Sequence, residues 1–202
     1  MARPSSPILS REKIALAAIE MIDQGDELKI QPLAKKLGVS LSSLYHHVDG
    51  RDGIVHAMRE VLSSRYEFDA PTGLGWRDTL KAGVHALWRL YSDHPRVMIH
   101  LLGVTVDEPA TLALYESLIT TLKRAGVPRD ELLTTVEVLD AFAFGAALDA
   151  LSPTRIFSPG DSRSEMGALL DEHSSGSARN QLLYEKGIDI ILTGIAARVP
   201  SK

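Results

Sequence analysis

The side chains best suited to chemistry lie in one short polar segment of the chain. Ser42, Ser43, Tyr45, His46 and His47 supply two hydroxyls, a phenol and two imidazoles. Short hydroxyl side chains let a backbone approach a nucleic acid closely, whereas a phenol or an imidazole is long enough to hydrogen-bond phosphate oxygens. This set is typical of noncovalent recognition of a polyanion.

The usual signatures of catalysis are missing from the sequence. It has 0 Cys, no Gly-rich phosphate loop, no HExxH pair and no GxSxG elbow. His46 and His47, as neighbours on a helix, point about 100° apart and are poorly placed to chelate one metal ion. Asp52 and His56, spaced i and i+4, are interpreted as a surface pair. We therefore expect no enzyme, no cofactor and no metal ion.

Apolar periodicity places the polar segment on a helix-turn-helix unit. The inner faces of its two helices carry the apolar residues Leu33, Ala34, Leu37, Leu44 and Val48. Gly38 suits a turn residue with positive φ, and Ser40 suits the N-cap of the second helix. In such a unit the second helix lies in the major groove and offers its first residues to base edges, so Leu41 is expected to touch a thymine methyl.

Charge is distributed unevenly along the 202 residues. The whole chain has a formal net charge of -4 and 45% hydrophobic residues, so it can bury a core but is not basic enough to coat nucleic acid. Residues 1–66 contain 9 Lys or Arg against 8 Asp or Glu, and the remainder contains 13 against 18. We expect only the N-terminal part to approach a polyanion.

Helical periodicity dominates the chain, and strand-like alternation is nearly absent, which predicts an all-α fold. The expected helices are 11–24, 30–37, 41 to about 48, 51 to about 68, 76–93, 96 to about 105, 110–125, 129–151, 165–171 and 178–199. Loops are expected at 152–164 and 174–177, and a domain boundary before Pro71 separates domain 1–66 from domain 67–202. No apolar run is long enough to span a membrane, and no leader is recognised, so a cytoplasmic protein is expected.

From about Arg11 to Met58 the sequence resembles the tetracycline-repressor (TetR) family of one-component regulators. The resemblance rests on the segments Leu33–Ser40 and Ser43–Val48, followed by Arg51. It implies base or backbone contacts for Ser42, Ser43, His46 and Gln31, and phosphate contacts for Tyr45, His47 and Arg51. Lys29 and Ile30 depart from the small hydroxylated residues common in the family, and Lys29 is expected to make a longer-range contact instead.

The same resemblance implies a three-helix DNA-binding domain joined through a long fourth helix to a larger ligand-binding and dimerisation domain. Within that larger domain, the pocket candidates are Trp88, His100 and Phe142, followed by His85 and Met98. Asp140 and Asp149 are rare charges beside apolar faces. Small residues at 141–150 and a stripe containing Tyr184, with Gly187 and Gly194, suit close helix pairing in a homodimer.

The expected function is that of a homodimeric repressor that binds a near-palindromic operator in double-stranded DNA and is released by a small molecule. Ligand binding would move the fourth helix and change the separation of the two reading heads. The alternative is a helical adaptor that acts through protein contacts without binding DNA, which the weak basicity of the N-terminal part and the Lys29 and Ile30 departures favour. The sequence leaves open the effector, the operator, the regulated genes and the choice between repressor and activator.

Overall fold

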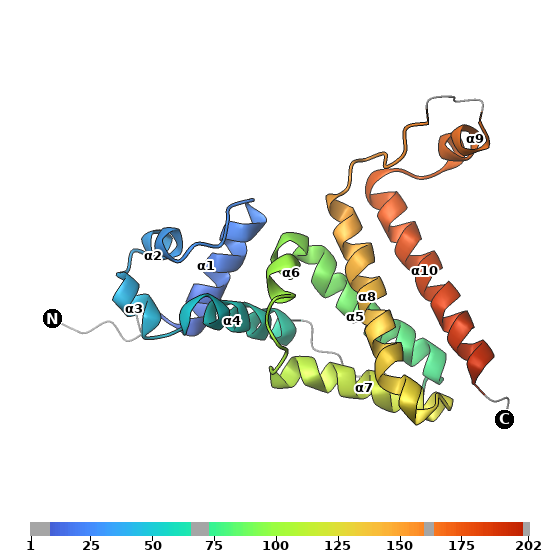
Figure 1. Cartoon of the computed structure of the whole chain (residues 1–202), viewed down its shortest axis with the longest axis horizontal. Coiled ribbons are helices and arrows are strands. Elements are labelled where there is room, and N and C mark those ends of the chain that lie inside the picture. The colour runs from blue at the N-terminus through green and yellow to red at the C-terminus, as the bar shows by residue number, and fades with distance from the viewer. Residues whose placement is uncertain (1–8, 66–72, 160–163, 200–202) are drawn as a thin grey trace. The chain divides into compact units, whose positions relative to one another are not determined.

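The computed structural model describes residues 9–65, 73–159 and 164–199, and every regular element in these ranges is helical, as predicted (Figure 1). The α-helices are α1 (Arg11–Asp23), α2 (Ile30–Leu37), α3 (Leu41–Tyr45), α4 (Gly50–Arg65), α5 (Trp76–Asp93), α6 (Pro95–Leu101), α7 (Pro109–Ala125), α8 (Leu132–Leu148), α9 (Glu165–Glu172) and α10 (Gly176–Arg198). The short 3-10 helices η1 (Arg129–Glu131) and η2 (Asp149–Leu151) flank α8. No helix in the described part of the chain is long and apolar enough to cross a membrane.

Local signals define the first three helices. The Ser10 hydroxyl accepts a hydrogen bond from the Lys13 N–H at the start of α1. Helix α2 ends at Gly38, whose φ of 67° lies in the left-handed region that glycine adopts without a Cβ clash. The Ser40 hydroxyl accepts from the backbone N–H of Ser43 and begins α3. The predicted turn and cap are therefore confirmed.

Three predicted helix ends were wrong. Helix α3 ends at Tyr45 instead of about Val48, because the chain tightens there and the His47 N–H bonds the Leu44 carbonyl. Helix α6 ends at Leu101 instead of about 105, because the carbonyls that follow turn toward a side chain of α4. Helix α10 begins at Gly176, inside the predicted 174–177 loop. The expected end of the fourth helix near Phe68 lies outside the described residues.

Two compact units can be distinguished, and each is described by itself. The head unit contains the described residues of 9–65 and 94–114, so α6 and the first turn of α7 pack with α1 to α4. The body unit contains 73–93, 115–159 and 164–199. The predicted boundary between residues 66 and 67 lies outside the described residues, and the functional division of the chain stays a prediction.

Each unit has its own apolar core. In the head unit α1 packs on α4, α2 and α6, and the fully buried side chains include Ile14, Leu33, Leu44, Ile54 and Met58. In the body unit α5 and α10 both pack on α8, and the buried side chains include Leu80, Leu87, Leu139, Ile188 and Leu192 (Figure 1). Most of the stabilisation of these helices comes from burial of such faces rather than from local propensity.

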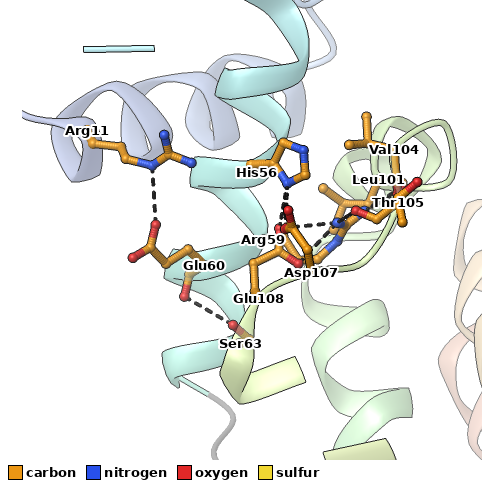
Figure 2. Close-up of polar contacts among 10 residues, drawn as sticks. All are labelled: Arg11, His56, Arg59, Glu60, Ser63, Leu101, Val104, Thr105, Asp107 and Glu108. Carbon is orange, nitrogen blue, oxygen red and sulfur yellow. Dashed lines mark hydrogen bonds and ion pairs between the residues drawn. The ribbon is translucent and has the colours of Figure 1, made fainter. Parts of the chain in front are cut away.

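Within the head unit, the buried guanidinium of Arg59 ties α4 to the segment that follows α6 (Figure 2). Its Nη2 donates to the carbonyls of Leu101 and Val104, both at 2.7 Å, and its Nη1 donates to the carbonyl of Thr105 at 2.8 Å. Nη1 also lies 3.1 Å from Oε2 of the buried Glu108. The last carbonyls of a helix lack partners within it, and here Arg59 supplies a donor to that of Leu101 and to two carbonyls in the segment beyond the helix.

Replacing Arg59 with Met is expected to lower the free energy of unfolding by about 3–5 kcal/mol, because it removes the guanidinium that pairs with the buried Glu108 carboxylate and donates to three carbonyls. Urea unfolding followed by circular dichroism measures the change. The control is Arg65→Met, an exposed arginine on the same helix, which should stay within about 0.5 kcal/mol of wild type. An Arg59→Met protein as stable as this control would contradict the assigned role.

Candidate functional site

A polar surface covers the outside of α2, α3 and the start of α4. Of the eight side chains predicted to contact DNA, seven are exposed and Ser43 is half-buried. The eight are Lys29, Gln31, Ser42, Ser43, Tyr45, His46, His47 and Arg51. Tyr45 is 52% exposed, so its phenol reaches solvent. All eight belong to the head unit.

The apolar residues beneath this surface fix its geometry. Leu33, Ala34, Leu44 and Val48 are each at most 3% exposed, and α2 packs directly on α3. Since the helix-turn-helix core is closed, α3 presents its polar residues from a rigid support. Leu41, at 37% exposed, is available for the apolar contact that the sequence predicts.

Two of the predicted cationic contacts already have partners in the head unit. Lys29 Nζ lies 2.6 Å from Glu27 Oε2, and the hydrogen bond that Lys29 donates to that carboxylate raises the pKa of Lys29. Lys29 gives α2 no side-chain cap. Arg51 Nη2 lies 2.9 Å from Nδ1 of His100 on α6. Because a guanidinium can only donate, His100 accepts through Nδ1 and carries its own proton on Nε2.

The five predicted ligand residues do not form one set. Met98 and His100 lie on α6 in the head unit, where Met98 is part of the core and His100 is bonded to Arg51. Burial, followed by the charge of Arg51, lowers the pKa of His100. His85, Trp88 and Phe142 lie in the body unit and meet around Tyr184.

His85, Trp88 and Tyr184 of this cluster line a cavity of about 520 Å³ between α5 and α10, whereas Phe142 is not part of its lining. The Trp88 and Tyr184 rings stack with centroids 4.3 Å apart, and His85 lies 5.5 Å from Trp88. The ring of Phe142 also stacks on that of Tyr184, with centroids 6.0 Å apart. The cavity rim is charged and includes Asp78, Lys81, Glu185, Lys186 and Asp189. The arrangement combines flat apolar surfaces with polar groups at the edge, which is the usual make-up of a small-molecule site.

Sequence reasoning assigned Tyr184 to a dimer stripe and missed it as a cavity residue. The available signal was Gly187, one turn further along α10. A Cβ at Gly187 would collide with the ring of Phe142, so the glycine is what allows α10 to approach α8 closely. That approach places Tyr184 over Phe142 and Trp88.

Two donors of the cluster are buried without a hydrogen-bond partner among the residues that the structure describes. They are the Trp88 indole N–H and the Tyr184 hydroxyl. Tyr184 is only 3% exposed, and burial raises the pKa of its phenol. An unsatisfied buried donor costs about 1–3 kcal/mol, so these two groups are polar atoms that the packing of the body unit leaves unpaired.

A second polar cluster in the body unit is fully paired. The Tyr91 hydroxyl donates to Asp140 Oδ1 at 2.6 Å, and the Tyr115 hydroxyl donates to the same oxygen at 3.0 Å. Burial raises the pKa of Asp140, while the two phenols lower it by stabilising the carboxylate. Asp149 is likewise paired, with Arg179 at 2.7 Å. Both rare charges noted in the sequence therefore have structural partners.

Comparison with known proteins agrees with the all-helical fold. The sequence model of the family described as tetracyclin repressor-like, C-terminal domain, matches residues 70–199. An HTH-type transcriptional regulator of Saccharopolyspora erythraea is 24% identical over 206 residues, covering 96% of this chain and 87% of that protein. The HTH-type transcriptional repressor DrrR1 of Streptomyces coeruleorubidus is 28% identical over 155 residues, covering 74% and 57% of the two chains. The crystal structure of ActR, a TetR family protein of Streptomyces coelicolor, in complex with actinorhodin superposes with a TM-score of 0.77 at 20% identity, covering 97% of this chain and 100% of that one.

Two tyrosine-to-phenylalanine changes should separate the paired cluster from the unpaired one. Tyr91→Phe removes a hydrogen bond to a carboxylate and is expected to lower the free energy of unfolding by about 1.5–3 kcal/mol. Tyr184→Phe removes a hydroxyl that has no partner, so stability should stay unchanged or rise. Urea unfolding of the two variants measures both effects, and an equal loss in both would contradict the assignment.

The lowered pKa of His100 predicts a pH dependence of stability. The folded state favours neutral His100, so its contribution is present above the unfolded value of 6.5 and is lost as pH falls through the folded value. His100→Gln should therefore shrink the loss of unfolding free energy between about pH 7.5 and about pH 5.5. Ile99→Gln, an exposed neighbour that does not titrate, should keep the wild-type slope. An unchanged slope in His100→Gln would contradict the prediction.

Proposed function

The chain belongs to the tetracycline repressor-like family, and from this premise we propose that it is a cytoplasmic, homodimeric DNA-binding repressor that a small molecule releases from its operator. The observation that carries the proposal is the exposed polar face of α3 on a closed helix-turn-helix core. Such a helix fits the major groove, and two copies related by a two-fold axis would read the half-sites of a near-palindrome.

The side chains of the polar surface divide by length and chemistry. Ser42, Ser43 and His46, with Gln31 of α2, are proposed to reach base edges or the nearby backbone. Tyr45 and His47 are proposed to hydrogen-bond phosphates, which position the helix without reading sequence. Arg51 adds a charge at the start of α4, and Lys29 contributes less because Glu27 neutralises it.

The effector is proposed to bind in the aromatic cavity of the body unit. The stacked rings of Trp88 and Tyr184 favour a flat ligand, and the charged residues that line the cavity favour one that also carries polar groups. Helix α5, which carries His85 and Trp88, leads along the chain into α6 at His94. Release requires that the ligand bind the DNA-free conformation more tightly than the DNA-bound one.

Pairing of two chains is supported by apolar side chains that α8 and α10 leave exposed. Leu133 and Val138 of α8 are 61% and 50% exposed, and Ile190 of α10 is 72% exposed. A second copy that covers these side chains is the proposed partner of the two helices.

Two substitutions test DNA binding on the fragment that the wild type enriches from genomic DNA. Arg51→Ala is expected to weaken binding and to reduce the slope of log affinity against log salt by about 1. Tyr45→Phe should weaken binding about 3- to 10-fold through a lost phosphate contact. Fluorescence anisotropy across a salt series measures both. Arg65→Ala, an exposed arginine at the other end of α4, is the control and should bind as wild type does.

Indifference of DNA affinity to both Arg51→Ala and Tyr45→Phe in folded protein would contradict the proposed reading surface. That outcome would favour the alternative of a helical adaptor that works through protein contacts.

A further inference from the structure

Three side chains with metal-binding atoms meet in the head unit at a place that the proposed DNA and effector sites do not use. His56 comes from α4, and Asp107 and Glu108 come from the segment just before α7 (Figure 2). His56 Nδ1 lies 3.1 Å from Asp107 Oδ1 and 3.0 Å from Glu108 Oε1. All three ligand atoms lie within 4.8 Å of one another. The sequence had suggested Asp52 as the partner of His56, and this was wrong.

The spacing of these atoms matches a small divalent ion. Nitrogen and oxygen ligands bind Zn²⁺ at about 2.0–2.2 Å, which places the ligand atoms of a tetrahedral site about 3.3–3.6 Å apart. The distances from His56 Nδ1 to the two carboxylates, 3.1 and 3.0 Å, need to grow by only a few tenths of an ångström. An imidazole with two carboxylates is a donor set for Zn²⁺, Co²⁺ or Ni²⁺ rather than for the oxygen-seeking Ca²⁺ or Mg²⁺.

The electrostatics of the site call for a cation between these atoms. A bare lone pair on Nδ1 would repel two carboxylate oxygens at this distance, so either a proton or a metal ion must lie between them. Asp107 and Glu108 together bring two negative charges, of which Arg59 compensates one. A divalent ion can therefore replace the proton of His56 without leaving a large excess of charge.

Burial provides a fixed ligand, and exposure of a neighbouring residue provides a route for the ion. Glu108 is 8% exposed at its side chain, and Arg59 Nη1 holds its carboxylate by donating to Oε1 at 3.2 Å and to Oε2 at 3.1 Å. Oε1 therefore has one lone pair directed at Arg59 and keeps a second for the His56 side. Asp107 is 71% exposed, so an ion can reach the site from solvent. Three protein ligands would leave a fourth position for water.

We propose that His56, Asp107 and Glu108 bind a borderline divalent metal ion of the Zn²⁺ class, which ties α4 to the segment before α7. Because Arg59 ties the same two segments through the preceding carbonyls, the ion would reinforce an existing contact. Binding of the ion would stabilise the head unit, and this stabilisation would not require the effector proposed above.

Co²⁺ titration of the full untagged chain, stripped by a chelator and free of DNA, tests the proposal. We expect about one Co²⁺ per chain with the visible absorption of a low-coordinate site, displaced by Zn²⁺. His56→Gln and Asp107→Asn should each weaken binding at least about tenfold. His47→Gln, an exposed histidine outside the cluster, is the matched control and should bind as wild type does.

Thermal unfolding gives a second readout that does not depend on absorption. Zn²⁺ should raise the Tm of wild type and of His47→Gln but not that of Asp107→Asn, whose exposed side chain leaves the fold intact. Absence of binding in wild type, or binding that survives both His56→Gln and Asp107→Asn, would overturn the proposal. Either result would leave the proposed DNA binding untouched, because no DNA is present in this experiment.

Discussion

The head unit depends on one buried guanidinium. Helix α6 has only seven residues, and the segment that follows it forms no regular helix before α7. Arg59 of α4 donates to the carbonyl of Leu101, the last residue of α6, and to the carbonyls of Val104 and Thr105 in that segment, while Glu108 neutralises its charge. This network fixes the end of α6 against α4, and removing one of its members leaves buried polar groups of the others without a partner. Burying an ion pair adds little net stability, and its value here is that it specifies one arrangement.

Several functional features converge on the same pair of helices. Arg51, at the start of α4, contacts His100 of α6, and His56 contacts the acidic residues that follow α6. A regulator of this kind needs an element whose position both DNA and effector can bias. Helix α6 follows α5 directly in the chain, and α5 carries two of the proposed effector residues. The last carbonyl of α6 is bonded to Arg59 of α4, the helix that begins with the proposed DNA contact Arg51. We therefore expect α6 to be such an element.

The sequence was informative wherever the determining forces are local. Helix α2 was predicted at its observed bounds because Pro32 suits a first turn and Gly38 adopts positive φ. The exposed face of α3 was likewise predicted, since Leu44 and Val48 fix which side is buried. Contacts between distant segments were missed. Arg59 meets carbonyls 42 to 46 residues away, and nothing in its local pattern distinguishes it from a surface arginine. The grouping of Tyr184 with Trp88 and Phe142 depends on the packing of α10, which periodicity does not fix.

Selection from sheared genomic DNA shows whether this chain reads a specific DNA sequence. Fragments bound by the purified protein at moderate salt would be sequenced, and the best fragment titrated with increasing salt. We expect one near-palindromic site whose affinity falls steeply with salt, since phosphate contacts release counterions. If a folded dimer, free of ligand, enriches no sequence, the chain is not a sequence-specific DNA-binding protein.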